Sequence, residues 1–171
     1  MVDLSSVADV AEIVGALTVI GAGAFAVVQI RDLRRQRTDA AAIEVVRSYQ
    51  SPDFVQAVRI VWDLPDGLTG DEIAARGPET ENAVITVGSV FDSIGAMVYH
   101  RIVPLDVVED ITGGTLRVSW RKLRPYAEAT RREAGMGKPY EWFQWLVERL
   151  EERYGSGGGQ GAHVTHRDWR A

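Results

Sequence analysis

The stretch from Ile13 to Ile30 contains no charged side chain, and it constrains the fold more than any other part of the sequence. Its 18 residues are mostly Val, Ile, Ala, Leu and Gly, and none is proline. A helix needs about 20 mostly apolar residues to cross the hydrocarbon core of a bilayer. Apolar residues from Val7 onward bring the stretch to that length. We therefore predict one transmembrane helix at about residues 9–30.

The charges on the two sides of this stretch differ in sign. The preceding residues include three acids and no basic side chain: Asp3, Asp9 and Glu12. Four arginines follow it directly: Arg31, Arg34, Arg35 and Arg37. Basic residues beside a membrane segment tend to stay in the cytoplasm. The pattern predicts a single-pass protein with its N-terminus outside and the remaining chain, from Arg31, in the cytoplasm.

Three other interpretations of the stretch remain open. A cleaved signal peptide would begin with basic residues, which are absent, although Ala24-Phe25-Ala26 resembles a cleavage site. Cleavage would leave a secreted soluble helical protein. A buried core helix seldom has 18 uncharged residues in a row. A helix lying in the membrane interface needs a strongly polar face, which this stretch lacks.

Residues 31–50 are predicted to continue the anchor as an Arg-rich juxtamembrane helix, because they contain neither Gly nor Pro. The four arginines either bind anionic lipid or only fix the orientation in the membrane. Small residues lie four apart in the anchor, as at Ala22 and Ala26, which permits close pairing of helices in a bilayer. A homo-oligomer is therefore open as well.

Residues 51–154 show helical patterns and almost no strand pattern, so the chain is predicted to be all-α with a small cytosolic bundle of about five to six helices. Ser51-Pro52-Asp53 is a strong helix start. The other predicted helices are a turn at 71–76, then 78–101, 105–111, 115–134 and 139–154. Gly113-Gly114 is predicted to end one helix, and Pro125 to kink or divide another. Residues 155–171 are predicted to form a disordered Gly-rich tail.

The helix at 78–101 is predicted to be the central core helix, because Val84, Val87, Phe91, Ile94 and Val98 repeat at three- and four-residue spacing. Gly88 and Gly95 lower its helix propensity, which predicts close approach of a neighbouring helix. Its length and apolar character also suit a second membrane span. A charge near its middle, at Asp92, argues against that alternative.

Charge and composition narrow the range of activities. Residues 51–112 carry a net charge of −8 and residues 113–154 carry +3, which predicts either mutual neutralisation or an acidic face for a basic partner. The absence of cysteine excludes disulfides, thiolate nucleophiles and Cys-ligated metal sites. No phosphate-binding loop, Rossmann fingerprint, nucleophile elbow or HExxH motif is present. We predict no cofactor, no metal site and no nucleic-acid partner.

Two groups of residues are singled out as candidates for function. Asp92 is a candidate buried carboxylate, and such a group needs a partner. The predicted partner is one of four arginines: Arg59, Arg117, Arg121 or Arg124. Trp142 and Trp145 are candidate interaction aromatics, because two such residues in one short helix do not easily both face inward. They would then contact a protein partner or the membrane interface.

Three segments together resemble an uncharacterised bacterial family of unknown function. They are Phe91–Ala96, Ile102–Val108 and the run from Trp120 through Arg124-Pro125 to Arg131-Arg132. The resemblance implies one N-terminal anchor followed by an all-α domain, and it implies no activity. Family members tend to have Glu where this chain has Asp92.

The preferred hypothesis is that the protein is a scaffolding or regulatory module on the bacterial inner membrane that binds another protein. The missing motifs weigh against an enzyme. A membrane-tethered enzyme that uses Asp92 with arginine side chains remains the alternative.

Overall fold

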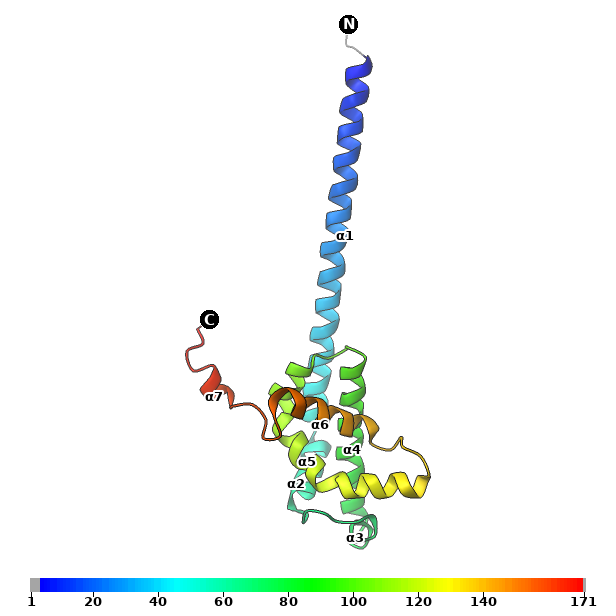
Figure 1. Ribbon diagram of the computed structural model, residues 1–171, viewed down its shortest axis with the longest axis vertical. Helices are drawn as coiled ribbons and strands as arrows, with labels where there is room; N and C mark the ends of the chain where they lie inside the picture. Colours follow the sequence, from blue (N-terminus) through cyan, green and yellow to red (C-terminus); the bar gives the residue numbers. More distant parts are fainter. Residues whose placement is uncertain (1–3, 171) are drawn as a thin grey trace. The chain divides into compact units, whose positions relative to one another are not determined.

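The computed structural model describes residues 4–170; within the first helix, side chains are described at positions 19, 21–23, 25–33, 36, 40 and 42–49. The described residues form helices and no strand, which confirms the all-α prediction. The helices are α1 (Leu4–Tyr49), α2 (Pro52–Asp63), α3 (Gly70–Ala74), α4 (Pro78–Tyr99), α5 (Leu105–Ala134), α6 (Glu141–Tyr154) and α7 (Ala162–Thr165) (Figure 1).

The chain divides after Ala40 into two compact units. The first unit consists of α1 up to that residue, and it exposes large apolar side chains, among them Phe25 and Ile30. The second unit contains the last turns of α1 and all later helices. Val45 in these last turns is buried, and the Tyr49 hydroxyl lies 2.6 Å from the Thr115 hydroxyl of α5.

The beginning of α2 is the one predicted from the sequence. The Ser51 hydroxyl accepts a hydrogen bond from the Phe54 N–H at 3.3 Å, and Pro52 occupies the first helical position. Side-chain capping satisfies N–H groups that have no partner within the helix. The start of α3 is held in a similar way, since Thr69 and Glu72 form a reciprocal capping box.

Helix α4 is the centre of the second unit, as predicted. All five residues of its predicted apolar stripe are buried. Phe91 of α4 contacts Phe54 of α2 and Phe143 of α6, with ring centroids 5.6 and 5.0 Å apart. Among the described residues, α4 alone is long and apolar enough to cross a membrane. Its buried stripe makes it the core helix of this unit.

Helix α5 differs from the prediction at Gly113-Gly114, because it continues through this pair without a break from Leu105 to Ala134. Gly113 leaves room for the ion pair between Glu109 and Arg117 of the same helix. A Cβ at Gly113 would lie 2.3 Å from a carboxylate oxygen of Glu109. Pro125 lies inside the continuous helix and does not divide it. Figure 1 shows the yellow end of α5 running in another direction from its green beginning, which agrees with the alternative expectation of a kink.

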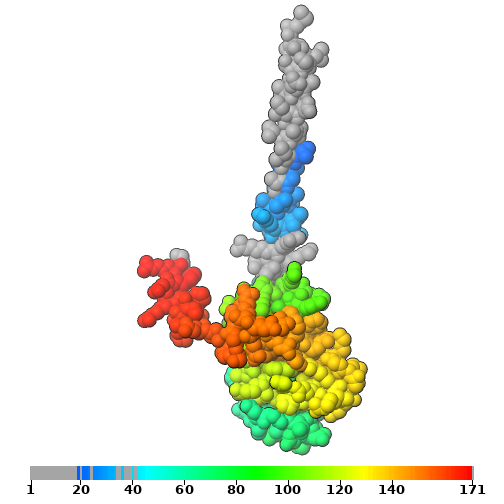
Figure 2. Space-filling view, viewed as in Figure 1, coloured from blue at the N-terminus to red at the C-terminus, as the bar shows by residue number. Residues whose placement is uncertain are grey.

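Four ion pairs join the acidic segment 51–112 to the basic segment 113–154, as the neutralisation prediction required. They are Glu109–Arg117, Asp66–Arg121, Asp66–Lys122 and Asp106–Arg153. Figure 2 shows α6 (orange) and the end of α5 (yellow) on the face turned to the viewer. Beyond α6, the chain contains the single-turn helix α7, and residues 159–170 are exposed.

Candidate interaction surface

Helix α6 is capped by a side chain from another helix. The residue before it, Tyr140, is in the left-handed conformation (φ 56°), and its side chain makes no capping hydrogen bond. Asp92 of α4 fills this role, since its Oδ1 accepts hydrogen bonds from the N–H groups of Trp142 and Phe143, each at 2.9 Å. Asp92 therefore fixes where α6 begins.

The predicted arginine partner of Asp92 is wrong. Arg117 pairs with Glu109, Arg121 with Asp66 and Arg124 with Glu128, and no ion pair of the described residues includes Asp92 or Arg59. Exposed N–H groups at a helix N-terminus carry a partial positive charge, so they satisfy a carboxylate as a cation would. Asp92 is also half-buried rather than fully buried.

Two glycines allow α6 to approach α4 closely, as the sequence predicted. A Cβ on Gly95 would lie 2.2 Å from the carbonyl oxygen of Trp142. A Cβ on Gly88 would lie 2.4 Å from the Tyr140 ring. Gly88, Asp92 and Gly95 lie on one stripe of α4, so a single helix face receives the start of α6.

Arg131 fixes the loop between α5 and α6 from the other side. Its Nε donates to the Pro139 carbonyl at 2.8 Å and its Nη2 to the Tyr140 carbonyl at 2.9 Å. Its Nη1 donates to the side chain of Gln144. The Arg131 side chain is half-buried. Composition and spacing gave no indication of this clamp, because its acceptors are mainly backbone carbonyls.

The clamped start of α6 presents a cluster of aromatic rings at the surface, which we call the aromatic surface: Tyr99, His100, Trp142 and Trp145. Ring centroids lie 4.6 Å apart for Tyr99–Trp142, 5.7 Å for Tyr99–Trp145 and 6.0 Å for Trp142–Trp145. Tyr99 is 53% exposed, and both tryptophans are half-buried. The guanidinium of Arg149 lies 5.8 Å from the centre of the Trp145 ring.

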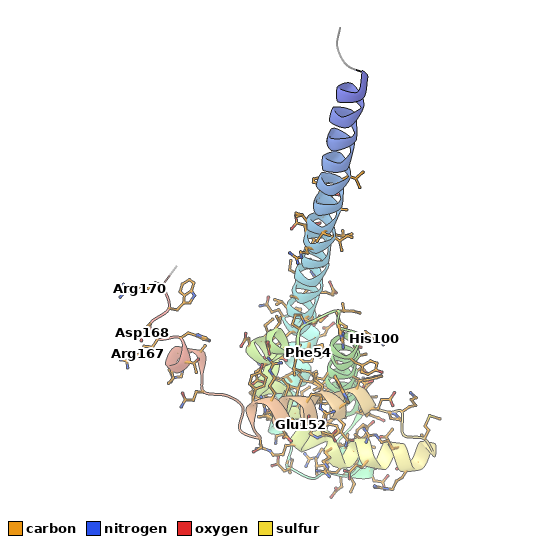
Figure 3. All side chains as sticks on the ribbon, turned by 45° about the horizontal axis from the view of Figure 1, so that its top comes forward. Phe54, His100, Glu152, Arg167, Asp168 and Arg170 are labelled. Carbon is orange, nitrogen blue, oxygen red and sulfur yellow. The ribbon has the colours of Figure 1, made fainter. Side chains whose placement is uncertain are left out.

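The aromatic surface joins the two predicted tryptophans to two residues that the sequence did not single out. Tyr99 and His100 come from the end of α4, where Figure 3 labels His100. They lie 42 or more positions away in the chain from Trp142, so sequence periodicity does not link them. Asp92 and Gly95 bring these two segments together.

Comparison with known proteins shows which family the chain belongs to. A family model described as a domain of unknown function, DUF4760, matches residues 7–150. The chain belongs to the DUF4760 family. This confirms the resemblance to an uncharacterised family, and the matched region includes α1 from residue 7 as well as the bundle through most of α6. No curated protein and no solved structure matched the chain.

The remaining predicted site of this DUF4760 chain is the membrane-proximal arginine group. Arg31 is exposed, and it precedes the exposed Asp32 and Leu33 in α1. The side chains of Arg34, Arg35 and Arg37 lie outside the described residues, as do most side chains of the predicted span 9–30. Whether the arginines bind lipid or only fix orientation stays a prediction.

An open depression of about 460 Å³ lies beside Asp92, lined also by Ser93, Thr130 and Lys138. Each of these groups has a structural partner: the two hydroxyls donate to carbonyls of their own helices, and Lys138 pairs with Glu141. Oδ1 of Asp92 accepts hydrogen bonds from the backbone N–H groups of Trp142 and Phe143. We therefore assign Asp92 a positioning role. Within the described residues, no group of three acidic or histidine side chains is arranged to hold a metal ion.

Proposed function

We propose that this chain is a single-pass protein of the bacterial inner membrane whose cytosolic helical bundle binds another protein. It would act as a scaffolding or regulatory module. The observation that carries the proposal is the aromatic surface, where large rings lie at the surface and are held in place by Asp92, Gly95 and Arg131. Tyr and Trp are enriched where proteins meet, since they bury large areas and lose little entropy.

The anchor is supported by the character of α1. Its helix is continuous from Leu4 to Tyr49, so its backbone groups are bonded within the helix, as a bilayer requires. Residues 9–30 of such a helix span about 33 Å, close to the thickness of the hydrocarbon core. Val19 and Phe25 are 72% and 63% exposed, which suits lipid better than water. Arg31 and the three following arginines would then lie at the cytoplasmic interface, where each contributes about 1 kcal/mol toward anionic lipid.

The aromatic surface also indicates the chemistry of the partner. Arg149 lies over Trp145, and the exposed Arg101 and Ile102 follow His100 directly in the chain. Aromatic rings flanked by arginines suit an apolar segment that carries acidic residues. We therefore expect a protein partner that presents such a segment.

Site-specific photo-cross-linking in intact cells tests the proposal. A photoreactive phenylalanine analogue would replace Tyr99 on the aromatic surface or, as the matched control, Trp62 on α2. Trp62 is 44% exposed and lies outside the aromatic surface. We expect a covalent adduct of one defined mass from position 99 and none from position 62. Trp145→Ala should abolish the adduct while the protein level stays unchanged.

Two results would contradict this proposal. Equal adducts from both positions would mean that contact is not specific to the aromatic surface. An adduct of twice the chain mass would make the partner a second copy, which is the homo-oligomer alternative.

A further inference from the structure

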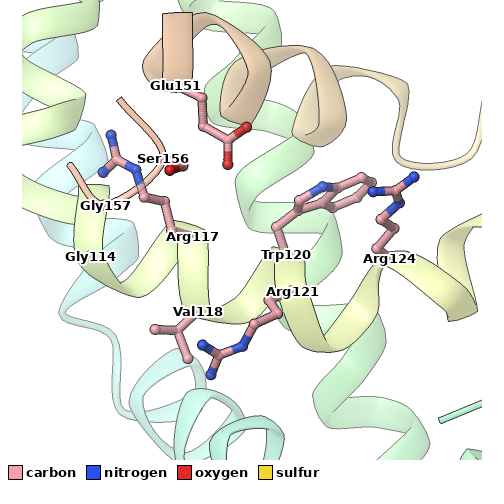
Figure 4. A pocket seen from close by; sticks show the side chains of 9 residues that line it. All are labelled: Gly114, Arg117, Val118, Trp120, Arg121, Arg124, Glu151, Ser156 and Gly157. Atoms are coloured by element: carbon pink, nitrogen blue, oxygen red, sulfur yellow. The ribbon is translucent and has the colours of Figure 1, made fainter. Parts of the chain in front are cut away.

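A second surface feature, separate from the aromatic surface, lies between α5, the end of α6 and the residues that follow it. It is a pocket of about 600 Å³ with three arginines from successive turns of α5 along its wall (Figure 4). Its lining includes the side chains of Arg117, Trp120, Arg121, Arg124 and Glu151. Each of the three guanidinium groups also has a carboxylate partner outside this set: Glu109, Asp66 or Glu128.

Arg117 is the most unusual of these side chains. It is only 11% exposed, and its Nη1 donates to both carboxylate oxygens of Glu109, at 3.0 and 2.9 Å. Its Nε and Nη2 are shielded from solvent and have no hydrogen-bond partner among the described residues. A buried donor without an acceptor costs about 1–3 kcal/mol, and more when it is charged. This edge of the guanidinium therefore calls for an acceptor.

The free edge has a specific shape. Nε–H and one Nη2–H point in the same direction, and this pair matches two oxygens of a carboxylate or phosphate. The other two arginines can also contribute. Arg121 and Arg124 are 63% and 64% exposed, and each is held only by a surface ion pair, with Asp66 at 3.2 Å and with Glu128 at 2.8 Å. Such pairs contribute little stability, so these guanidinium groups can turn to a better acceptor.

We propose that this pocket binds a phosphate group, either inorganic phosphate or the monoester of a larger molecule. The charge of such a group at neutral pH is about −1.5 to −2, so it competes with Asp66 and Glu128 for Arg121 and Arg124. The free edge of Arg117 holds two of its oxygens, and Arg121 and Arg124 approach from the open side.

The Gly-rich segment after α6 lies against the Arg117–Glu109 ion pair. Ser156 and Gly157 line the pocket, and a Cβ on Gly158 would lie 3.2 Å from Nη1 of Arg117. The segment lies on the ion pair because it lacks side chains there. Since Nε and Nη2 of Arg117 are closed to solvent, a phosphate reaches them only when neighbouring groups move.

Isothermal titration calorimetry on the full chain in neutral detergent, at constant ionic strength, tests this proposal. The probes are inorganic phosphate and dihexanoyl phosphatidic acid below its micelle concentration, with dihexanoyl phosphatidylcholine as the lipid control. We expect saturable binding of at least one of the first two. Binding of both assigns recognition to the phosphate group itself, and binding of the lipid alone assigns the site to a lipid headgroup.

Two variants and one control separate binding in the pocket from nonspecific attraction of phosphate to basic side chains. Arg117→Lys keeps the charge beside Glu109 and removes the two-donor edge, and it should weaken binding about tenfold or more. The double variant Arg121→Ala/Arg124→Ala should weaken it similarly without altering the buried pair. Arg132→Ala, an exposed arginine of α5 outside the pocket, should change the affinity less than about twofold.

The proposal is overturned if neither phosphate probe binds, or if binding survives unchanged in the double variant. If Arg117→Lys fails to fold, as judged by circular dichroism, the double variant decides alone.

Discussion

At the scale of single residues, the structure depends on a few groups that hold α6 against α4. Asp92 accepts two backbone N–H groups of α6, Gly95 leaves room for the Trp142 carbonyl, and Arg131 binds the preceding loop. All three are directed at backbone atoms. Their effects are therefore on the position of α6 and of the aromatic surface that it carries.

Removing the Asp92 carboxylate should leave two N–H groups at the start of α6 without their acceptor. We expect Asp92→Ala to lower the free energy of unfolding by about 1–3 kcal/mol, and Asp92→Asn by less, because an amide oxygen still accepts. Thermal unfolding followed by circular dichroism measures both. The exposed Glu81→Ala in the same helix is the control. Equal unfolding temperatures for Asp92→Ala and the control would contradict this role.

Substitution by alanine should change the free energy of unfolding in opposite directions at Gly95 and at Gly114. In Gly95→Ala the Cβ meets backbone of Trp142, which cannot rotate away, so a loss of at least about 1–3 kcal/mol is expected. Gly114→Ala in α5 meets nothing within 4 Å, so the better helix propensity should stabilise the protein by about 0.5–1 kcal/mol. Chemical denaturation gives both values. A stabilising Gly95→Ala would show that α4 and α6 are not in this close contact.

At the scale of helices, apolar periodicity predicted α2, α4 and α6 because each buries one clear stripe. The predicted helix end at Gly113-Gly114 is wrong, since α5 continues through it and Glu109 and Arg117 form an ion pair across Gly113. The predicted site residues fared similarly. Trp142 and Trp145 were recognised from composition, whereas the cap by Asp92 and the clamp by Arg131 bind backbone atoms that carry no sequence pattern.

The end of α6 is joined to the start of α5 by the hydrogen bond that Tyr154 donates to Asp106. Burial and this bond raise the pKa of Tyr154 from 10.0 to about 12. Between these pH values the folded chain binds a proton at Tyr154 that the unfolded chain has lost, so stability should fall as the pH rises from 10 to 12. Tyr154→Phe should lack this pH-dependent contribution to stability.

Denaturation at pH 9.5 and pH 11.5 measures the difference between the wild type and Tyr154→Phe. The predicted result is a smaller decrease in stability for the variant than for the wild type. The same decrease in both proteins would show that Tyr154 does not contribute.

At the scale of the whole molecule, we propose that residues 9–30 anchor in a membrane the helical bundle that carries the aromatic surface. The family match extends over both parts, from residue 7 to residue 150. The bundle presents two separate features, the aromatic surface and the arginine-lined pocket, so partner binding and phosphate binding can be abolished independently. Trp145→Ala should leave phosphate affinity unchanged, and Arg121→Ala/Arg124→Ala should leave the cross-linked adduct unchanged.

Fractionation of cells that produce the full chain tests the central claim most directly. Membranes would be washed at alkaline pH, and spheroplasts would be treated with protease from outside. The account predicts that the chain remains in the washed membrane pellet and that the bundle from Ala41 onward is protected from the protease until the spheroplasts are lysed. A chain that is washed off, is found outside the cell, or is digested in intact spheroplasts would contradict the proposed anchor or its orientation.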